Sequence, residues 1–275
     1  MQHLQRYALA SSLIVWMAAC SVAGDEPTTG SLSEAIVGGT AATDPAVVLL
    51  EFGNSLCTGV LVSPKVVATA KHCIEGSGNG PIQVRFVNNQ AQNGPSINTV
   101  KKQGAPNADT GALLLAQAAP VPWVPLNTAP IESSVNQAIR LVGFGLTGTH
   151  AGNPGVKRQG MTTLLQVGIF GPDPTVGNVL VTDVTPQATC NGDSGGPQFM
   201  SIGGTEYVVG TTIGAYSPTG GNIQCGQGLG IAANVAAYSA FFNSFITAND
   251  PPSCAADNRC APNCATPDPD CSNCG

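Results

Sequence analysis

Short apolar runs rich in β-branched residues recur along this chain, and they restrict its fold more than any other feature. Each run is bounded by turn-forming residues such as glycine, proline, asparagine and aspartate. In chain order the runs are VVLLEF, TGVLVSPKVVATA, IQVRFV, IRLVGFG, TTLLQVGI, NVLVTDV and EYVVGTTI. This rhythm predicts an antiparallel barrel or sandwich, and 275 residues are enough for one large all-β domain or two smaller units.

One segment near the C-terminus changes to a helical period. Its apolar residues fall on a single stripe: Val235, Tyr238, Phe241, Phe242, Phe245 and Ile246. Asn234 is placed to cap the start, so the pattern predicts one C-terminal helix that ends near Asn249. Residues 250–275 follow as a separate tail. They contain five cysteines and almost no apolar side chains, so only disulfides or a bound metal could give the tail a fixed shape.

The N-terminus predicts export. Its apolar run ALASSLIVWMAA follows a basic start and is too short to span a bilayer comfortably, as in a signal peptide. Two cleavage sites stay open: SVA, which would end a signal peptide of residues 1–23, and MAAC, a lipoprotein-like box that would leave Cys20 for acylation. Residues 24–35 are polar and predict a pro-segment. Either cleavage places the mature protein outside the cytoplasm, secreted or anchored to the outer membrane or cell surface.

The charge pattern narrows the range of partners. Only 9% of residues are charged, the formal net charge is -6, and no basic patch interleaves with aromatic residues. These features argue against nucleic acid as a partner. Nothing in the sequence requires a cofactor or a catalytic metal, and we expect a monomer.

The stretch TCNGDSGGPQF surrounds Ser194 with three glycines and a proline. A serine hydroxyl becomes a strong nucleophile only when a base takes its proton and donors stabilise the oxyanion that forms. Because His3 belongs to the signal peptide, the base is either His72 or His150. His72 ends the strand-like run VVATAKHC, where a rigid scaffold can aim its side chain, whereas His150 lies in an evident loop.

The acidic partner of such a base should be shielded from water. Asp109, within NADTGALLLAQ, is the aspartate best embedded in an apolar run, and burial of a carboxylate is costly unless it is partnered. Asp173 is more typical of an exposed turn, and Asp183 is a strand residue without comparable flanks. Taken singly, a histidine beside a strand is more often structural, and an aspartate such as Asp109 is more often a turn or cap residue.

Four motifs occur in order along the chain: IVGG at 36–39, TAKHC at 69–73, DTGALLLA at 109–116 and CNGDSGGP at 190–197. They resemble the landmarks of chymotrypsin/trypsin-like serine proteases, and the resemblance spans about Ile36 to Asn249. It implies an all-β fold of two antiparallel six-stranded β-barrels with a C-terminal helix, followed here by the short Cys-rich tail. It also implies a secreted serine endopeptidase that hydrolyses peptide bonds through an acyl-enzyme, so its partners would be protein or peptide substrates.

The resemblance assigns the catalytic roles. Ser194 would be the nucleophile and His72 the general base and then acid. Asp109 would fix the histidine tautomer and balance the imidazolium. The backbone N–H groups of Gly192 and Ser194 would form the oxyanion hole.

Two disulfides are implied by the same resemblance. Cys57–Cys73 would anchor the histidine loop, and Cys190–Cys225 would lie beside the substrate pocket. Each would tie catalytic elements together and stabilise the fold by roughly 2–4 kcal/mol.

Substrate selection is implied by residues around that pocket. Ala188, six positions before the nucleophile, would form its base, and Gly230 would leave one wall open. Thr212 and Gly214 would contact the substrate backbone, in a TIG stretch that stands where the family usually has SWG. A substrate cation against a neutral base would lack a partner, so we expect cleavage after uncharged residues, with large apolar or aromatic ones favoured over small ones.

The first motif implies a zymogen. In the family, cleavage before the first isoleucine, here Ile36, frees an ammonium that pairs with the aspartate before the catalytic serine, here Asp193. The residue before the cut is Ala35 rather than arginine or lysine. Because Ala35 is small and uncharged, we expect intermolecular self-activation at this bond.

Two other interpretations stay open. A pseudoprotease would keep the barrels as a binding module at the cell surface, although such proteins commonly lose the serine or the histidine, and both are present here. Alternatively, the chain is mainly a surface adhesin whose function lies in residues 250–275. The aspartates of that tail suit either calcium or a solvated disulfide knot.

Overall fold

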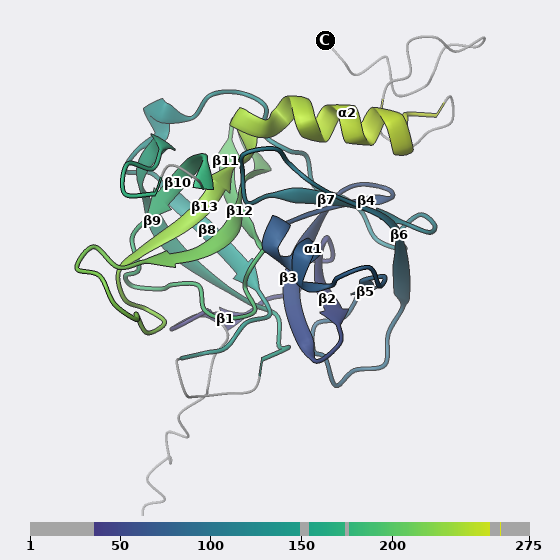
Figure 1. Ribbon diagram of the computed structural model, residues 1–275, viewed down its shortest axis with the longest axis horizontal. Coiled ribbons are helices and arrows are strands. Elements are labelled where there is room, and N and C mark those ends of the chain that lie inside the picture. Colours follow the sequence, from purple (N-terminus) through teal and green to yellow (C-terminus); the bar gives the residue numbers. More distant parts are fainter. Residues whose placement is uncertain (1–35, 149–153, 174–175, 254–258, 260–275) are drawn as a thin grey trace, which may run out of the picture. The chain divides into compact units, whose positions relative to one another are not determined.

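The computed structural model describes residues 36–148, 154–173, 176–253 and 259. Strands make up most of the regular structure, and they close into two six-stranded antiparallel β-barrels (Figure 1). The short apolar runs therefore predicted the all-β class, and the family resemblance predicted the two barrels. The signal peptide, the pro-segment, Cys20 and His150 lie outside the described residues, as does the tail beyond residue 253 except Arg259.

The N-terminal barrel closes in the order β2-β3-β4-β7-β6-β5. Its strands are β2 (Val47–Phe52), β3 (Ser55–Ser63), β4 (Val66–Thr69), β5 (Gln83–Arg85), β6 (Ser96–Gly104) and β7 (Gly111–Leu115). Residues 47–50 of β2 are all fully buried, so both faces of this strand are covered. This explains why the run VVLL is continuous rather than alternating.

The C-terminal barrel closes in the order β9-β10-β13-β12-β11-β8, with β8 pairing back to β9. Its strands are β8 (Ala138–Gly143), β9 (Arg158–Ile169), β10 (Asn178–Thr182), β11 (Pro197–Ile202), β12 (Thr205–Tyr216) and β13 (Leu229–Asn234). The short strand β1 (Thr40–Ala41) adds to the free side of β9. A bulge in β12 leaves Ile213 outside the register with β13.

The helix α2 (Ser239–Asn249) follows the second barrel in the chain but packs on the core of the first (Figure 1). Phe242 and Phe245, both on the predicted stripe, are buried in that core. Asn234 is a cap as predicted, yet its side chain accepts the N–H of Ala236 in the 3-10 turn η3 (Val235–Tyr238), which precedes the helix. The helix therefore connects the two barrels by apolar packing.

Two shorter helical segments complete the fold, α1 (Lys71–Gly76) and the 3-10 turn η1 (Glu132–Ser134). No helix in the described ranges has the length and apolar character needed to cross a membrane.

Candidate active site

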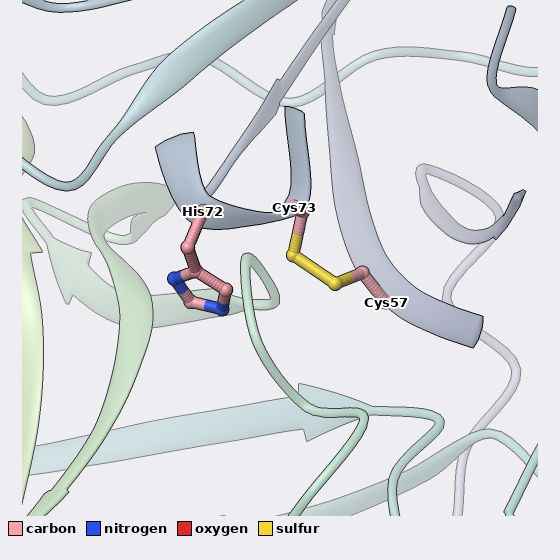
Figure 2. Close-up of side chains that lie close together, drawn as sticks. All are labelled: Cys57, His72 and Cys73. Carbon is pink, nitrogen blue, oxygen red and sulfur yellow. A yellow bond between two sulfur atoms is a disulfide. The ribbon is translucent and has the colours of Figure 1, made fainter. Parts of the chain in front are cut away.

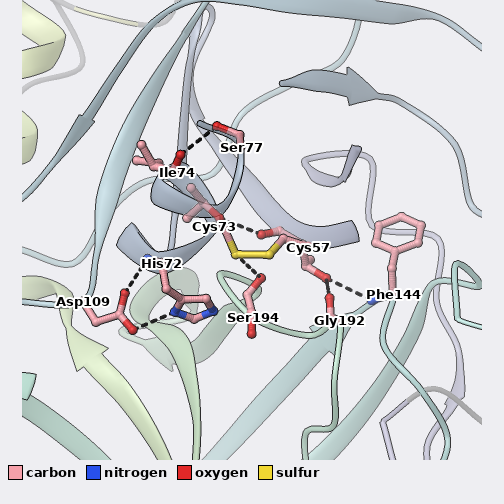
Figure 3. The surroundings of a disulfide bond; sticks show 11 residues. Cys57, His72, Cys73, Ile74, Ser77, Asp109, Phe144, Gly192 and Ser194 are labelled. Atoms are coloured by element: carbon pink, nitrogen blue, oxygen red, sulfur yellow. Dashed lines mark hydrogen bonds and ion pairs between the residues drawn. A yellow bond between two sulfur atoms is a disulfide. The ribbon is translucent and has the colours of Figure 1, made fainter. Parts of the chain in front are cut away.

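His72 lies on α1, the short helix that directly follows β4. Its Nδ1 atom is 2.7 Å from Oδ2 of Asp109, and its backbone N–H donates to Oδ1 of the same carboxylate at 2.9 Å (Figure 3). Strand pairing explains this contact. Antiparallel β4 and β7 place Thr69 opposite Gly111, so the residues after β4 and those before β7 meet at one end of the barrel.

The Asp109 carboxylate is ionised at neutral pH. Burial alone raises its pKa, but the hydrogen bonds that it accepts from His72, and the attraction of the His72 ring whenever that ring is protonated, outweigh burial and hold the pKa below its usual value. An ionised carboxylate only accepts hydrogen bonds, so it keeps a proton on Nδ1 of His72 and leaves Nε2 with a free lone pair. The geometry therefore prepares His72 to act as a base.

Ser194 lies on the turn that precedes β11. Its backbone oxygen accepts the N–H of Thr58 at 2.9 Å and lies 3.7 Å from Sγ of Cys73, the neighbour of His72. The Nε2 side of the His72 ring points toward Ser194 (Figure 3). Within the described residues no hydrogen bond joins the two side chains, and such bonds commonly tighten only when substrate is bound.

Both predicted disulfides are present. Cys57–Cys73 joins β3 to α1 directly beside His72 (Figure 2), and Cys190–Cys225 joins the turn of the nucleophile to the loop after β12. His72 and the two nearby sulfur atoms lie close together. The sulfurs are bonded to each other, however, so they are not thiolate ligands for a metal.

Two backbone N–H groups on the turn that carries Ser194 have no acceptor in the described part of the chain. Those of Gly192 and Ser194 donate no hydrogen bond within the described chain, whereas the other N–H groups of residues 193–196 all reach backbone oxygens. Gly192 has φ +99°, and a Cβ there would lie 2.9 Å from the backbone Cα of Gly145, so the position favours glycine. The turn therefore offers two backbone donors to an oxyanion.

Gly195 allows the same turn to lie directly against the first barrel. Its φ is +78°, and a Cβ there would lie 2.5 Å from the backbone oxygen of Thr58 and collide with Oγ1 of Thr69. Because Thr69 ends β4, this close approach fixes the distance between the nucleophile turn and the strand that leads to His72.

A cavity of about 190 Å³ opens beside Ser194. The predicted substrate contacts Thr212 and Gly214 both line it, and none of the described residues around it has an acidic or basic side chain. The cavity can therefore receive an uncharged side chain without leaving a charge unpaired.

The other two predicted pocket residues, Ala188 and Gly230, are not among the described residues that line this cavity, although each adjoins one that is: Ala188 precedes Thr189, and Gly230 pairs with Ala215. Ala188 is buried, and its backbone oxygen accepts the N–H of Val37 at 2.8 Å. Gly230 lies on β13, where a Cβ would collide with Oγ1 of Thr182 on the paired strand β10. Backbone pairing therefore determines the surroundings of both residues, which the motif spacing alone did not reveal.

Ile223 and Gln224 line the cavity, and the sequence interpretation missed them. They directly precede Cys225, whose disulfide to Cys190 brings this loop to the turn of the nucleophile. The predicted Cys190–Cys225 disulfide could therefore have indicated that Ile223 and Gln224 lie beside the cavity.

Asp193 is fully buried beneath the nucleophile turn. Its Oδ1 accepts the N–H of Gly145 at 2.8 Å, its Oδ2 accepts that of Cys190 at 2.8 Å, and the backbone nitrogen of Ile36 also donates to it. No basic side chain in the described residues pairs with this carboxylate. Burial raises its pKa to about 7, against the opposing effect of the three N–H donors.

Two antiparallel barrels that bring a histidine–aspartate pair to a serine on a glycine-rich turn define the class of chymotrypsin-like serine proteases. A family model described as Trypsin matches residues 36–242, well over half of the chain. The chain belongs to the trypsin family, a family of serine protease hydrolases that act on peptide substrates.

Proposed function

We propose that the protein is an active serine endopeptidase in which Ser194, His72 and Asp109 form the catalytic triad. The observation that supports this most directly is the ionised Asp109 carboxylate on Nδ1 of His72, with Nε2 directed toward Ser194. A histidine whose only role is structural would not need a serine on the Nε2 side of its ring. Here the serine also lies at the mouth of a cavity and beside two unused backbone donors.

Each group has one task in the proposed reaction. Oγ of Ser194 attacks the peptide carbonyl while Nε2 of His72 takes its proton, and Asp109 stabilises the resulting imidazolium. The oxyanion accepts hydrogen bonds from the N–H groups of Gly192 and Ser194, and one such donor lowers the barrier by roughly 3–4 kcal/mol. His72 then protonates the leaving amine, and water repeats the same steps on the acyl-enzyme.

Labelling with a fluorophosphonate probe tests this proposal against the binding-module alternative. The mature protein should label at Ser194, and Ser194→Ala should abolish the label. The exposed Ser133 provides a matched control, because Ser133→Ala should label like the wild type. A folded mature protein that does not label would favour a binding module.

We expect cleavage after uncharged residues, with large apolar or aromatic ones favoured over small ones. The support is the uncharged lining of the cavity, because a substrate cation there would be desolvated without a partner. Matched peptides with Phe, Leu, Ala, Arg or Lys at the cleavage site test the expectation. A higher kcat/KM for Arg or Lys would overturn it.

We also propose that the chain is a zymogen activated by cleavage between Ala35, which lies outside the described residues, and Ile36. The cut would replace the peptide nitrogen next to Asp193 with an ammonium, and the buried carboxylate would then gain a cation. The same pair would stabilise the turn that carries Gly192 and Ser194. In the precursor, which lacks this ion pair, we expect the same turn to be less stable and to bind an oxyanion more weakly than in the cleaved enzyme.

The proposed activator is a second copy of the enzyme. A Ser194→Ala precursor should be cut before Ile36 by a trace of mature enzyme, as N-terminal sequencing would report. If the precursor stays intact while the same enzyme cleaves peptides, a separate protease must make the cut.

We also propose that the protein is exported and that its tail, residues 250–275, retains it at the cell surface. Within the tail, Arg259 binds Asp250 at 3.0 Å, and Asp250 accepts the hydroxyl of Ser63 on β3 at 2.7 Å, so the start of the tail contacts the body of the protein. A chain truncated after Arg259 would keep this contact. Unchanged peptidase activity with lost surface retention would support an anchor, and unchanged retention would rule one out.

A further inference from the structure

Lys157 is a buried lysine that the proposed catalysis does not use. Its residue is only 2% exposed, its Nζ donates to the backbone oxygen of Asp44 at 2.6 Å, and it lies 5.4 Å from the ring centre of Phe144. An ammonium has three N–H donors, so two of them have no acceptor within the described residues. A buried ammonium with only one hydrogen-bond acceptor is unfavourable unless another group provides further acceptors or an opposite charge.

Asp44, the one carboxylate whose charge is shown to act on Lys157, already has a different partner. Oδ1 of Asp44 binds Nη2 of Arg140 at 2.6 Å, and Arg140 also binds Glu206. Asp44 therefore acts on Lys157 only through its backbone oxygen and, at longer range, its charge. Burial lowers the pKa of Lys157 to about 8, and the charge of Asp44 opposes only part of this effect.

Lys157 lines an open pocket of about 580 Å³ that shares no residue with the cavity beside Ser194. Among the described residues that line it, Lys157 is the only one with an ionisable side chain. Apolar walls come from Pro45, Phe86 and Val121, and the side-chain amide of Asn93 adds a polar group. The pocket thus combines one buried cation with an apolar surface.

The wall of this pocket is held in shape by backbone hydrogen bonds. Residues 86–95 connect β5 to β6, and the backbone N–H of Lys157 donates to the oxygen of Asn88 in this connection at 2.8 Å. Oε1 of Gln92 accepts the N–H groups of both Asn88 and Asn89. The loop and Lys157 are therefore already positioned, so a ligand would not have to order them.

We propose that this pocket binds a small carboxylate with an apolar body, whose oxygens accept the two remaining N–H donors of Lys157. The carboxylate would supply the missing charge, and its body would displace water from the apolar walls. Two sources share this chemistry. One is a free apolar carboxylic acid, and the other is the C-terminal residue of a peptide released by an enzyme that cleaves after apolar residues.

The test uses the mature Ser194→Ala protein, so it does not depend on peptidase activity. Isothermal titration with 3-phenylpropionate and with N-acetyl-phenylalanine represents the two sources, and the tighter ligand identifies which one the pocket favours. N-acetyl-phenylalanine amide is the neutral match. We expect the amide to bind at least about tenfold more weakly than the acid, because a hydrogen bond to a charged group is lost.

Lys157→Met separates this pocket from the catalytic cavity. The substitution keeps an apolar stem of similar length, and binding of both acids should weaken at least about tenfold. Lys101→Met, at an exposed lysine outside the pocket, removes the same charge and should leave the affinity unchanged. The proposal would be overturned if Lys157→Met bound the acids as tightly as the protein with Lys157. It would also be overturned if the protein with Lys157 bound neither acid at about 10 mM.

A measurement on the Ser194→Ala protein with Lys157 retained covers the case in which Lys157→Met does not fold. The Nζ resonance of Lys157, followed by NMR against pH, should show a higher pKa when N-acetyl-phenylalanine is bound, since the anion stabilises the ammonium. An unchanged titration at saturating ligand would show that the acid binds elsewhere, and the proposal would fail even if Ser194 is the nucleophile.

Discussion

Two regions of this protein bury a charge, and they compensate for it in opposite ways. Asp193 lies below the nucleophile turn and accepts three backbone N–H groups, so most of its hydrogen-bonding capacity is used. Lys157 donates to one backbone oxygen and faces an open pocket. Under the two proposals above, the missing cation of Asp193 would come from the chain's own Ile36 after cleavage, whereas the missing anion of Lys157 would come from a bound ligand.

The largest effect should follow from removing the charge of Asp193. In the mature enzyme, Asp193→Asn would leave the ammonium of Ile36 buried without its partner, at a cost of roughly 3–5 kcal/mol. We expect a folded protein whose kcat/KM falls on the order of 100-fold or more. Asp183→Asn, at a partly exposed aspartate on the second barrel, is the matched control. Full activity in Asp193→Asn would contradict the proposed ion pair.

The precursor offers a pH test of the same carboxylate. Burial raises the pKa of Asp193 from 3.8 to about 7, so folding favours its protonated form. The contribution of Asp193 to the free energy of unfolding is therefore fully present below about pH 4. It falls by about 4 kcal/mol as the pH rises through 7. Urea unfolding of the Ser194→Ala precursor should show this fall, and the cleaved form should show much less of it.

A precursor that also carries Asp193→Asn provides the control for this pH test. It has no carboxyl group to titrate at this position, so its stability should change less between pH 4 and 7. If the fall is the same with and without Asp193, other groups cause it.

A smaller effect, at higher pH, is expected at Lys157. Burial lowers its pKa from 10.5 to about 8, so folding favours the neutral amine and carries a cost of about 3 kcal/mol below pH 8. The free energy of unfolding should rise as the pH goes from 8 to 10.5. Lys157→Met should remove this rise, and Lys101→Met should keep it. A rise of equal size in Lys157→Met would show that its charge is not the cause.

The smallest effect concerns a buried charge that already has its partner. Asp250 accepts the hydroxyl of Ser63 at 2.7 Å and binds Arg259 at 3.0 Å, so Arg259→Ala leaves it partly satisfied. We expect thermal unfolding to report a loss of about 1–2 kcal/mol, without a change in kcat/KM. A loss as large as that expected for Asp193→Asn would mean that partnered and unpartnered charges do not differ here.

Local pattern made much of the fold predictable from sequence. The run VVLL, buried on both faces of β2, and the stripe with Phe242 and Phe245 both report periodicity that neighbouring residues impose on the chain. The ordered motifs around His72, Asp109 and Ser194 identified the family that the matched family model shows. Both disulfides followed from the same resemblance.

Contacts between distant segments could not be predicted in this way. The pairing of β4 with β7 brings Asp109 to His72, and no residue near either one encodes that approach. The same holds for the cavity. Ile223 lines it because the Cys190–Cys225 disulfide brings its loop to Ser194, whereas Ala188 pairs with Val37 and is not among the described lining residues.

Sequence alone thus determined the all-β class, the C-terminal helix and the residues able to form a serine protease site. Tertiary structure decided which backbone N–H groups stay unused, which residues line the cavity and which charges are buried. Lys157 shows the reason most clearly. Its burial depends on Asp44, Phe144 and a loop of the other barrel. The cost of a buried charge depends on all the groups around it, and only the folded chain brings those groups together.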